Sequence, residues 1–185
     1  MKWQIDPAHT SVEAAAKHMM FTTVRVRFPG ATGEIELDPE QPQAAKIVDL
    51  SIPVASLDSG DTKRDGHLRS PDFFDAQTYP QVGFHSTAVR LVDKDGRYEV
   101  KGDLTIRGET KPVTLDVMVH GIGPDPMRPG RQRAFIDAKA LIDRREWGLV
   151  WNMPVPQGVL VSHDIRLEIS SQLVSEVAAS EAKAA

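Results

Sequence analysis

The 185-residue chain contains no cysteine, which excludes disulfide frameworks, thiolate nucleophiles and cysteine-based zinc sites. Neither sign of charge dominates, because 22 Lys and Arg residues stand against 26 Asp and Glu residues. The basic residues are scattered, so the composition indicates neither a nucleic-acid face nor a polybasic membrane segment. No apolar run approaches the roughly 20 residues of a membrane-spanning helix. We therefore expect that the chain does not bind nucleic acid and is not an integral membrane protein.

Motifs that carry catalysis or hold cofactors are also missing. The sequence has no G-x-S-x-G element around a nucleophilic serine and no glycine-rich loop that would cradle a phosphate. None of the six histidines stands in H-E-x-x-H or another recognised metal-ligand spacing. We therefore predict no catalytic residue, no metal and no cofactor. Residues 1–7 lack the apolar run of a signal peptide, which predicts a cytoplasmic location.

The longest ordered pattern runs from Val12 to Phe28, where even positions are almost all apolar and odd positions carry the charges. Such alternation is typical of a half-buried strand. A straight strand of this length would span roughly 56 Å, so we expect the chain to bend or break at residues 19–21. The even positions combine small side chains with a single histidine, which indicates an interior that something else occupies. They are Val12, Ala14, Ala16, His18, Met20, Thr22, Val24, Val26 and Phe28.

Alternation recurs along most of the chain in segments separated by turns. About eight such segments predict an all-β fold, either an antiparallel barrel or a sandwich. The pattern stops around residues 60–76, where a short helical insertion is predicted. Small inner residues favour a barrel that holds one ligand over a barrel filled by its own side chains. These small residues are Ala14, Ala16, Gly102, Ala134, Ala138 and Ala140.

Some segments are less clear. The strand over residues 81–92 has an ambiguous inward face, which contains either Val82 and Phe84 or Val89 and Leu91. Residues 121–130 are rich in Gly and Pro and predict a loop. We assign one domain to residues 1–174 and a flexible C-terminal tail to residues 175–185.

Four stretches carry a family resemblance, which extends over residues 3–173. They are Ile5-Asp6 with His9, Ser11, Val12 and His18; residues 55–61 with Arg64-Asp65, residues 67–70, residues 72–75 and Tyr79-Pro80; residues 102–108 with residues 110–113; and Asp143-Arg144 with residues 147–149 and Trp151-Asn152. Together they make the sequence similar to the YceI-like family of bacterial polyisoprenoid-binding, lipocalin-like proteins. The resemblance implies an eight-stranded antiparallel barrel around a long apolar tunnel for an isoprenoid tail, and often a homodimer.

The inward pattern and this resemblance together predict non-catalytic binding, for transport or storage, of one isoprenoid lipid. The lipid is an isoprenoid quinone or a polyprenyl phosphate, whose head group His18 and His163 would orient. The residues predicted to line its site are Val12, Ala14, Ala16, His18, Met20, Leu50, Ile52, Leu104, Leu115, Val117, Ile136, Ala138, Trp151, His163 and Ile165. The alternatives are an enzyme acting on a lipid or small amide in the same cavity, and a structural or stress-related barrel with no ligand.

Three local questions stay open at this level. The charged cluster Asp61, Arg64, Asp65 and Arg69 either contacts an anionic head group or holds the insertion in place through ion pairs. Trp147 and Trp151 either gate the tunnel mouth or anchor a core. Ala14 and Ala16 stand where the family pattern has larger residues, so they either widen the pocket or are compensated by neighbours such as Met20.

Overall fold

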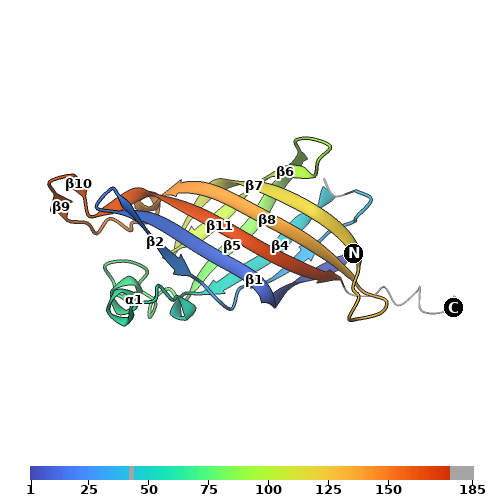
Figure 1. Ribbon diagram of the computed structural model, residues 1–185, viewed down its shortest axis with the longest axis horizontal. Coiled ribbons are helices and arrows are strands. Elements are labelled where there is room, and N and C mark those ends of the chain that lie inside the picture. The colour runs from blue at the N-terminus through green and yellow to red at the C-terminus, as the bar shows by residue number, and fades with distance from the viewer. Residues whose placement is uncertain (42–43, 176–185) are drawn as a thin grey trace.

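The computed structural model describes residues 1–41 and 44–175, and within them strands dominate (Figure 1). None of the helices in these ranges is long and apolar enough to cross a membrane. The strands are β1 (Lys2–His18), β2 (Thr22–Arg27), β3 (Thr32–Glu36), β4 (Lys46–Pro53), β5 (Gln81–Leu91), β6 (Arg97–Ile106), β7 (Glu109–Pro124), β8 (Gln132–Asp143), β9 (Pro154–Val155), β10 (Gly158–Val159) and β11 (Val161–Ser175). The helical elements are η2 (Val54–Ser56), α1 (Thr62–Arg69) and η3 (Arg144–Trp147).

The sheet closes on itself as an eight-stranded antiparallel barrel, which confirms the predicted fold. The strand order is β11-β8-β7-β6-β5-β4-β3-β1, and β1 also pairs with β11. β1 is long enough to pair with β3 near its start and with β2 near its end. In Figure 1, α1 and the β9–β10 hairpin lie at one end of the long axis, and the N-terminus lies at the other.

The expected break in the first alternating stretch is confirmed. β1 ends at His18, β2 begins at Thr22, and the two strands pair in antiparallel register. Met19 and Met20 form the turn with φ of 49° and 69°, the left-handed region that non-glycine residues seldom adopt. The single alternating stretch in the sequence therefore corresponds to two paired strands, β1 and β2.

β-Bulges explain the segments whose faces were unclear. In β5, the pairing with β6 shifts register between Ser86 and Ala88, so Val82 and Phe84 point inward before the bulge and Val89 after it. In β7, a shift between Val119 and Gly121 lets the strand continue to Pro124. The prediction of a loop beginning at residue 121 was therefore wrong, because the bulge hides the continuing strand.

The barrel extends one residue beyond the domain boundary that was predicted at residue 174. Ser175, which was assigned to the tail, is the last residue of β11 and lies buried. The remainder of the predicted tail, residues 176–185, lies outside the described residues.

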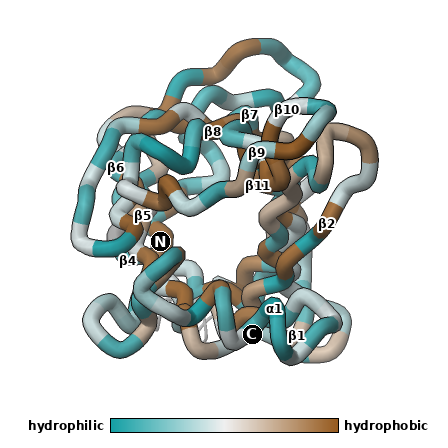
Figure 2. The backbone as a smooth tube through the Cα atoms, turned by 90° about the vertical axis from the view of Figure 1, so that its left-hand side faces the viewer, coloured by the Kyte–Doolittle hydropathy of each residue, from teal (hydrophilic) through white to brown (hydrophobic). Residues whose placement is uncertain are grey.

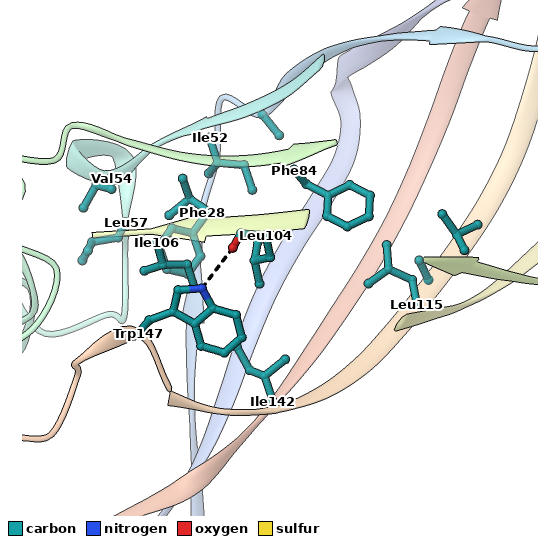
Figure 3. Close-up of a cluster of buried hydrophobic side chains, with 14 of the residues drawn as sticks. Phe28, Ile52, Val54, Leu57, Phe84, Leu104, Ile106, Leu115, Ile142 and Trp147 are labelled. Atoms are coloured by element: carbon teal, nitrogen blue, oxygen red, sulfur yellow. Dashed lines mark hydrogen bonds between the residues drawn. The ribbon is translucent and has the colours of Figure 1, made fainter. Parts of the chain in front are cut away.

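Trp147 anchors the core at the α1 end of the barrel. Its side chain is 1% exposed, and its indole N–H donates to the backbone carbonyl of Leu104 at 3.0 Å (Figure 3). Figure 3 shows the ring among Ile106, Ile142 and Leu104. The anchoring interpretation of Trp147 is thus confirmed, since a buried indole N–H keeps a partner.

The opposite end of the barrel is closed by a second apolar cluster. Trp3 is fully buried and its indole N–H donates to the carbonyl of Leu37 at 3.0 Å. Ala134, one of the small residues predicted to leave space, packs here with Ile35 and Leu173. Gly102 leaves no space either, because a Cβ at this position would lie 2.4 Å from the ring of Phe84. These small residues accommodate neighbouring aromatic and aliphatic groups.

A buried charge network stands beside this closed end. The guanidinium of Arg133 donates to Asp6 at 2.8 Å and to Asp125 at 2.9 Å. The hydrogen bond from Arg133 lowers the pKa of Asp6, and the bond to Asp6 in turn raises the pKa of Arg133. Burial raises the pKa of Asp125, but the backbone N–H of Met127 and the Arg133 guanidinium outweigh burial and lower it overall. One cation thus holds β8 against the start of β1 and the loop after β7.

We expect Arg133→Met to reduce the free energy of unfolding by about 3 kcal/mol, because the change leaves two carboxylates without their cation in a buried site. The matched control is Arg97→Met, which removes an exposed cation that approaches Asp116 at only 3.9 Å. That control is expected to cost less than about 0.5 kcal/mol. Urea unfolding at neutral pH measures both, and equal losses for the two variants would contradict the assigned role of Arg133.

Candidate ligand-binding cavity

The barrel encloses a cavity of about 590 Å³, a size within the range of about 300–1,000 Å³ that small-molecule sites occupy. All the strands of the barrel contribute to its wall, and the side chains that they contribute are overwhelmingly aliphatic or aromatic. Figure 2 looks along the barrel from the α1 end and shows the strands arranged in a ring, with α1 and the β9–β10 hairpin on opposite sides of the ring.

Most of the residues predicted from the sequence line the cavity. The strands β1, β4, β6, β7, β8 and β11 and the segment after η3 place them there. They are Val12, Ala14, Ala16, His18, Leu50, Ile52, Leu104, Leu115, Val117, Ile136, Ala138, Trp151 and Ile165. Of the small inner residues, Ala14, Ala16 and Ala138 line the cavity, and they are therefore the ones that contribute to its width.

Met20 does not line the cavity, and its predicted place there was wrong. The alternation ends at His18, and Met20 belongs to the turn, where 45% of its side chain is exposed. Its Cγ would lie 3.6 Å from a Cβ built on Gly158, so it packs on the β9–β10 hairpin. Met20 therefore does not fill the space that Ala14 and Ala16 leave.

His163 also lies outside the lining, because β11 bulges where it passes the end of β1. Ala16 pairs with Ile165 and His18 with Val161, so a step of two residues on β1 opposes a step of four on β11. Ser162 occupies the bulge and accepts the backbone N–H of Lys17 at 2.9 Å. The bulge breaks the alternation that predicted an inward His163, and the histidine pair expected at the head group does not share the cavity.

The cavity opens at the α1 end. The lining residues with exposed side chains are Lys17, Lys63 and Arg64, and all of them lie at this end. Lys17 donates to the hydroxyl of Thr23 at 3.0 Å on the neighbouring β2, while Lys63 and Arg64 belong to the first turn of α1. The mouth thus lies between α1 and the β1–β2 turn.

An aromatic cluster stands at this mouth. Trp151 meets His67 edge to face with ring centroids 4.6 Å apart, and its ring lies 5.4 Å from that of Phe73. Nε2 of His67 lies 2.8 Å from a carboxylate oxygen of Asp72, which fixes the imidazole. Trp151 is half-buried and lines the cavity, so its place agrees with the gating interpretation that the sequence left open.

The charged cluster of the insertion holds α1 in place, although not through the ion pairs that were expected. Arg64 donates from Nε to the hydroxyl of Ser59 at 2.8 Å, and Arg69 donates to the carbonyl of Leu57 at 2.6 Å. Asp65 accepts from the backbone N–H of Ser59 at 2.9 Å. The side chain of Asp61 caps the N-terminus of α1 by accepting hydrogen bonds from the backbone N–H groups of Lys63 and Arg64.

Arg144 is a buried cation at the same end, and it lines the cavity. Its guanidinium donates to the backbone carbonyls of Ser162 at 3.0 Å, of Val161 at 3.4 Å and of Leu149. Burial lowers its pKa. The neighbouring Asp143 is occupied by Arg145, which donates from Nε at 2.9 Å.

Sequence reasoning missed four residues of the mouth. Lys17 stands at an outward position of β1 and reaches the mouth because the strand ends there. Lys63, His67 and Arg144 lie in segments without alternation, so no periodic pattern pointed to the cavity. For Arg144 and His67 the only available signal was membership of the motifs that carried the family resemblance.

Comparison with known proteins identifies the family of the chain and supports its fold. The sequence profile of the YceI-like domain matches residues 3–173. A UPF0312 protein of Vibrio cholerae is 38% identical over 143 residues, which cover 77% of this chain and 73% of the relative. The crystal structure of BcnA from Burkholderia cenocepacia superimposes with a TM-score of 0.74 at 26% identity, over 93% of this chain and 99% of the other. A polyisoprenoid binding domain from Saccharophagus degradans has a TM-score of 0.65 at 14% identity, over 94% and 98% of the two chains.

The pairing of Asp143 with Arg145 beside the mouth predicts a specific pH dependence. The hydrogen bonds from Arg145 lower the pKa of Asp143 from 3.8 to about 2. Because the native pKa is depressed, the pair stabilises the fold above about pH 4 and loses this effect as the pH falls towards about 2. We expect Asp143→Asn to cost about 1 kcal/mol at neutral pH, after allowance for solvent screening, and almost nothing at about pH 2.

Chemical unfolding of the wild type and the variant between about pH 2 and 7 measures this difference. Asn keeps the acceptor that caps η3, so the comparison isolates the charge. Asp49→Asn, at an exposed position of β4, corrects for the loss of one carboxylate. A destabilisation that is the same at both ends of the pH range would refute the role of the ion pair.

Proposed function

The chain belongs to the family of YceI-like domains, and from this premise we propose that it binds one long-chain isoprenoid lipid in the barrel cavity, without catalysis. The observation that carries the proposal is the contrast between the wall and the mouth of the cavity. The wall is apolar along the barrel, and its exposed polar groups gather at one end. Such a site suits a molecule with a long apolar chain and one polar end, held for transport or storage.

The energy of binding would come from the buried chain. Each CH₂ removed from water contributes about 0.8 kcal/mol, so a five-carbon isoprene unit contributes on the order of 3–4 kcal/mol before the entropic costs of association. The S. degradans neighbour is a polyisoprenoid binding domain, although its likeness at 14% identity concerns the fold alone. It supports the proposal because the same barrel architecture occurs in a domain that binds polyisoprenoids.

An enzyme acting in the same cavity is the less favoured alternative, because the groups near the mouth are engaged in structural bonds. Asp72 and His67 form a pair at 2.8 Å, and Ser70 lies close in the sequence. The Ser70 hydroxyl, however, donates to the backbone carbonyl of His67 at 2.7 Å and not to an imidazole nitrogen. This arrangement caps α1 and leaves the serine without an activating base.

A barrel filled by its own side chains is the other alternative. A cavity of about 590 Å³ is inconsistent with a filled interior, since cores of folded proteins leave few voids larger than a water molecule. We therefore favour the ligand-holding barrel.

Mass spectrometry of an organic extract from detergent-free protein tests the proposal. We expect one isoprenoid per chain in the wild type. Ala14→Phe should reduce the bound lipid by about tenfold or more, because it places a ring in the space that the alanine leaves. Ala88→Phe introduces the same ring at an exposed position of β5 that does not line the cavity, and this control should retain the lipid.

Thermal unfolding of both variants shows whether Ala14→Phe still folds. The proposal fails if the wild-type extract is clean and stays clean after incubation with isoprenoid quinones and with polyprenyl phosphates. It also fails if Ala14→Phe folds and binds as much lipid as the wild type.

A further inference from the structure

We propose that the mouth of the cavity is a binding site for an anionic head group, so that the chain prefers a polyprenyl phosphate to a neutral isoprenoid quinone. The inference rests on the proposed function, because it assigns the polar end of the lipid that the cavity would hold. The groups that would form the site are Lys17, Lys63 and Arg64 at the rim, together with Arg144, which is buried and also lines the cavity.

Among the described residues that line the cavity, the exposed side chains at the rim all carry positive charge. They come from two separate elements, since Lys17 is the second-last residue of β1 while Lys63 and Arg64 lie in the first turn of α1. Like charges around one opening repel each other, and an anion between them relieves this repulsion. A quinone carbonyl accepts a hydrogen bond but carries no net charge, so it would not relieve the repulsion between these cations.

No direct ion pair within the described residues holds these cations, although Asp61 and Asp65 lie near Arg64 and Asp143 lies near Arg144. In the part of the chain that the structure describes, no carboxylate forms an ion pair within 4.0 Å with any of the four. The acidic groups near the mouth have other partners. Glu13, which also lines the cavity, lies 3.8 Å from Nε of Arg25. Asp61 caps α1, Asp65 bonds Ser59, Asp72 bonds His67 and Asp143 bonds Arg145.

Arg144 is a buried cation beside the cavity. Only 4% of this residue is exposed, and backbone carbonyls are the partners of its guanidinium. Carbonyl dipoles satisfy its N–H groups, and the nearby carboxylate of Asp143, which is paired with Arg145, offsets only part of the cost of burying the charge, because the pKa of Arg144 stays lowered. An anion at the mouth would add opposite charge that acts on Arg144 through a poorly screened interior.

Phosphate fits these groups better than a fatty-acid carboxylate does. A phosphate monoester carries about −1.5 to −2 charges at pH 7 and offers three acceptor oxygens, whereas a carboxylate carries one charge. Three rim cations on two elements match the higher charge. The guanidinium of Arg64 donates to Ser59 from Nε and Nη2, so it would meet a phosphate oxygen through Nη1. The head group would then sit between β1 and α1 while the chain runs towards Trp3.

Binding of three probes tests the site: undecaprenyl phosphate, undecaprenol with the same chain and a hydroxyl head, and ubiquinone. We expect the wild type to bind the phosphate about tenfold or more tightly than the alcohol, with an affinity that falls as salt rises. The double variant Lys17→Gln/Lys63→Gln should lose most of this preference and bind the alcohol as the wild type does. Both side chains are exposed, so the variant is expected to fold.

The matched control is Lys94→Gln/Lys139→Gln, which makes the same change in net charge at exposed residues that do not line the cavity. It should keep the preference for phosphate. Equal affinities of the wild type for phosphate and alcohol, or equal losses in both double variants, would overturn the head-group site and leave the proposed lipid binding standing. If the wild type binds none of the three probes, the proposed function itself fails.

Discussion

The pairing of β1 with β11 is the constraint on which the rest of the structure depends. These strands are the first and last of the described chain, and their antiparallel register runs from Trp3 opposite Ser175 to His18 opposite Val161. Their pairing joins the two edges that the sheet would otherwise expose, because β2 and β3 cover only the other side of β1. Closure allows the interior to stay apolar without a core of packed helices. It also fixes which ends of the strands surround the mouth.

The bulges within this closure show what alternation predicts and what it does not. A period of two assigned the inward faces of Val12–Ala16 and of the strands that carry Leu104, Leu115 and Ala138, because these segments pair without interruption. The bulges of β5 and β7 each insert one residue and reverse the faces beyond them. The bulge of β11 inserts two residues, so Val161 and Ile165 both line the cavity while His163 lies within the irregular stretch between them. Nothing in the local composition marks these points. They depend on the partner strand.

The mouth was the least predictable part of the site for a related reason. Lys17 is on the outward face by period, and α1 with the segment after η3 has no alternation to interpret. Contacts of the insertion with Ser59 and Leu57 bring Lys63 and His67 to the opening. Trp151 reaches the opening from the segment after η3, where the side chain of the adjacent Asn152 bonds the backbone of Val161. Such contacts follow from the tertiary structure and leave little trace in the sequence. The family motifs contained these residues without indicating their geometry.

The two ends of the barrel are built from different chemistry, and this difference gives the cavity a direction. At the closed end Trp3 and Leu173 pack against each other, and Arg133 is neutralised by Asp6 and Asp125. At the open end no carboxylate of the described residues contacts the buried guanidinium of Arg144, and Lys17 stands exposed. A cation that a carboxylate of the fold contacts serves stability, whereas a cation at the rim without such a contact can meet an anionic ligand. Under the proposed function, an amphipathic lipid would enter tail first and stop where its head group meets these charges.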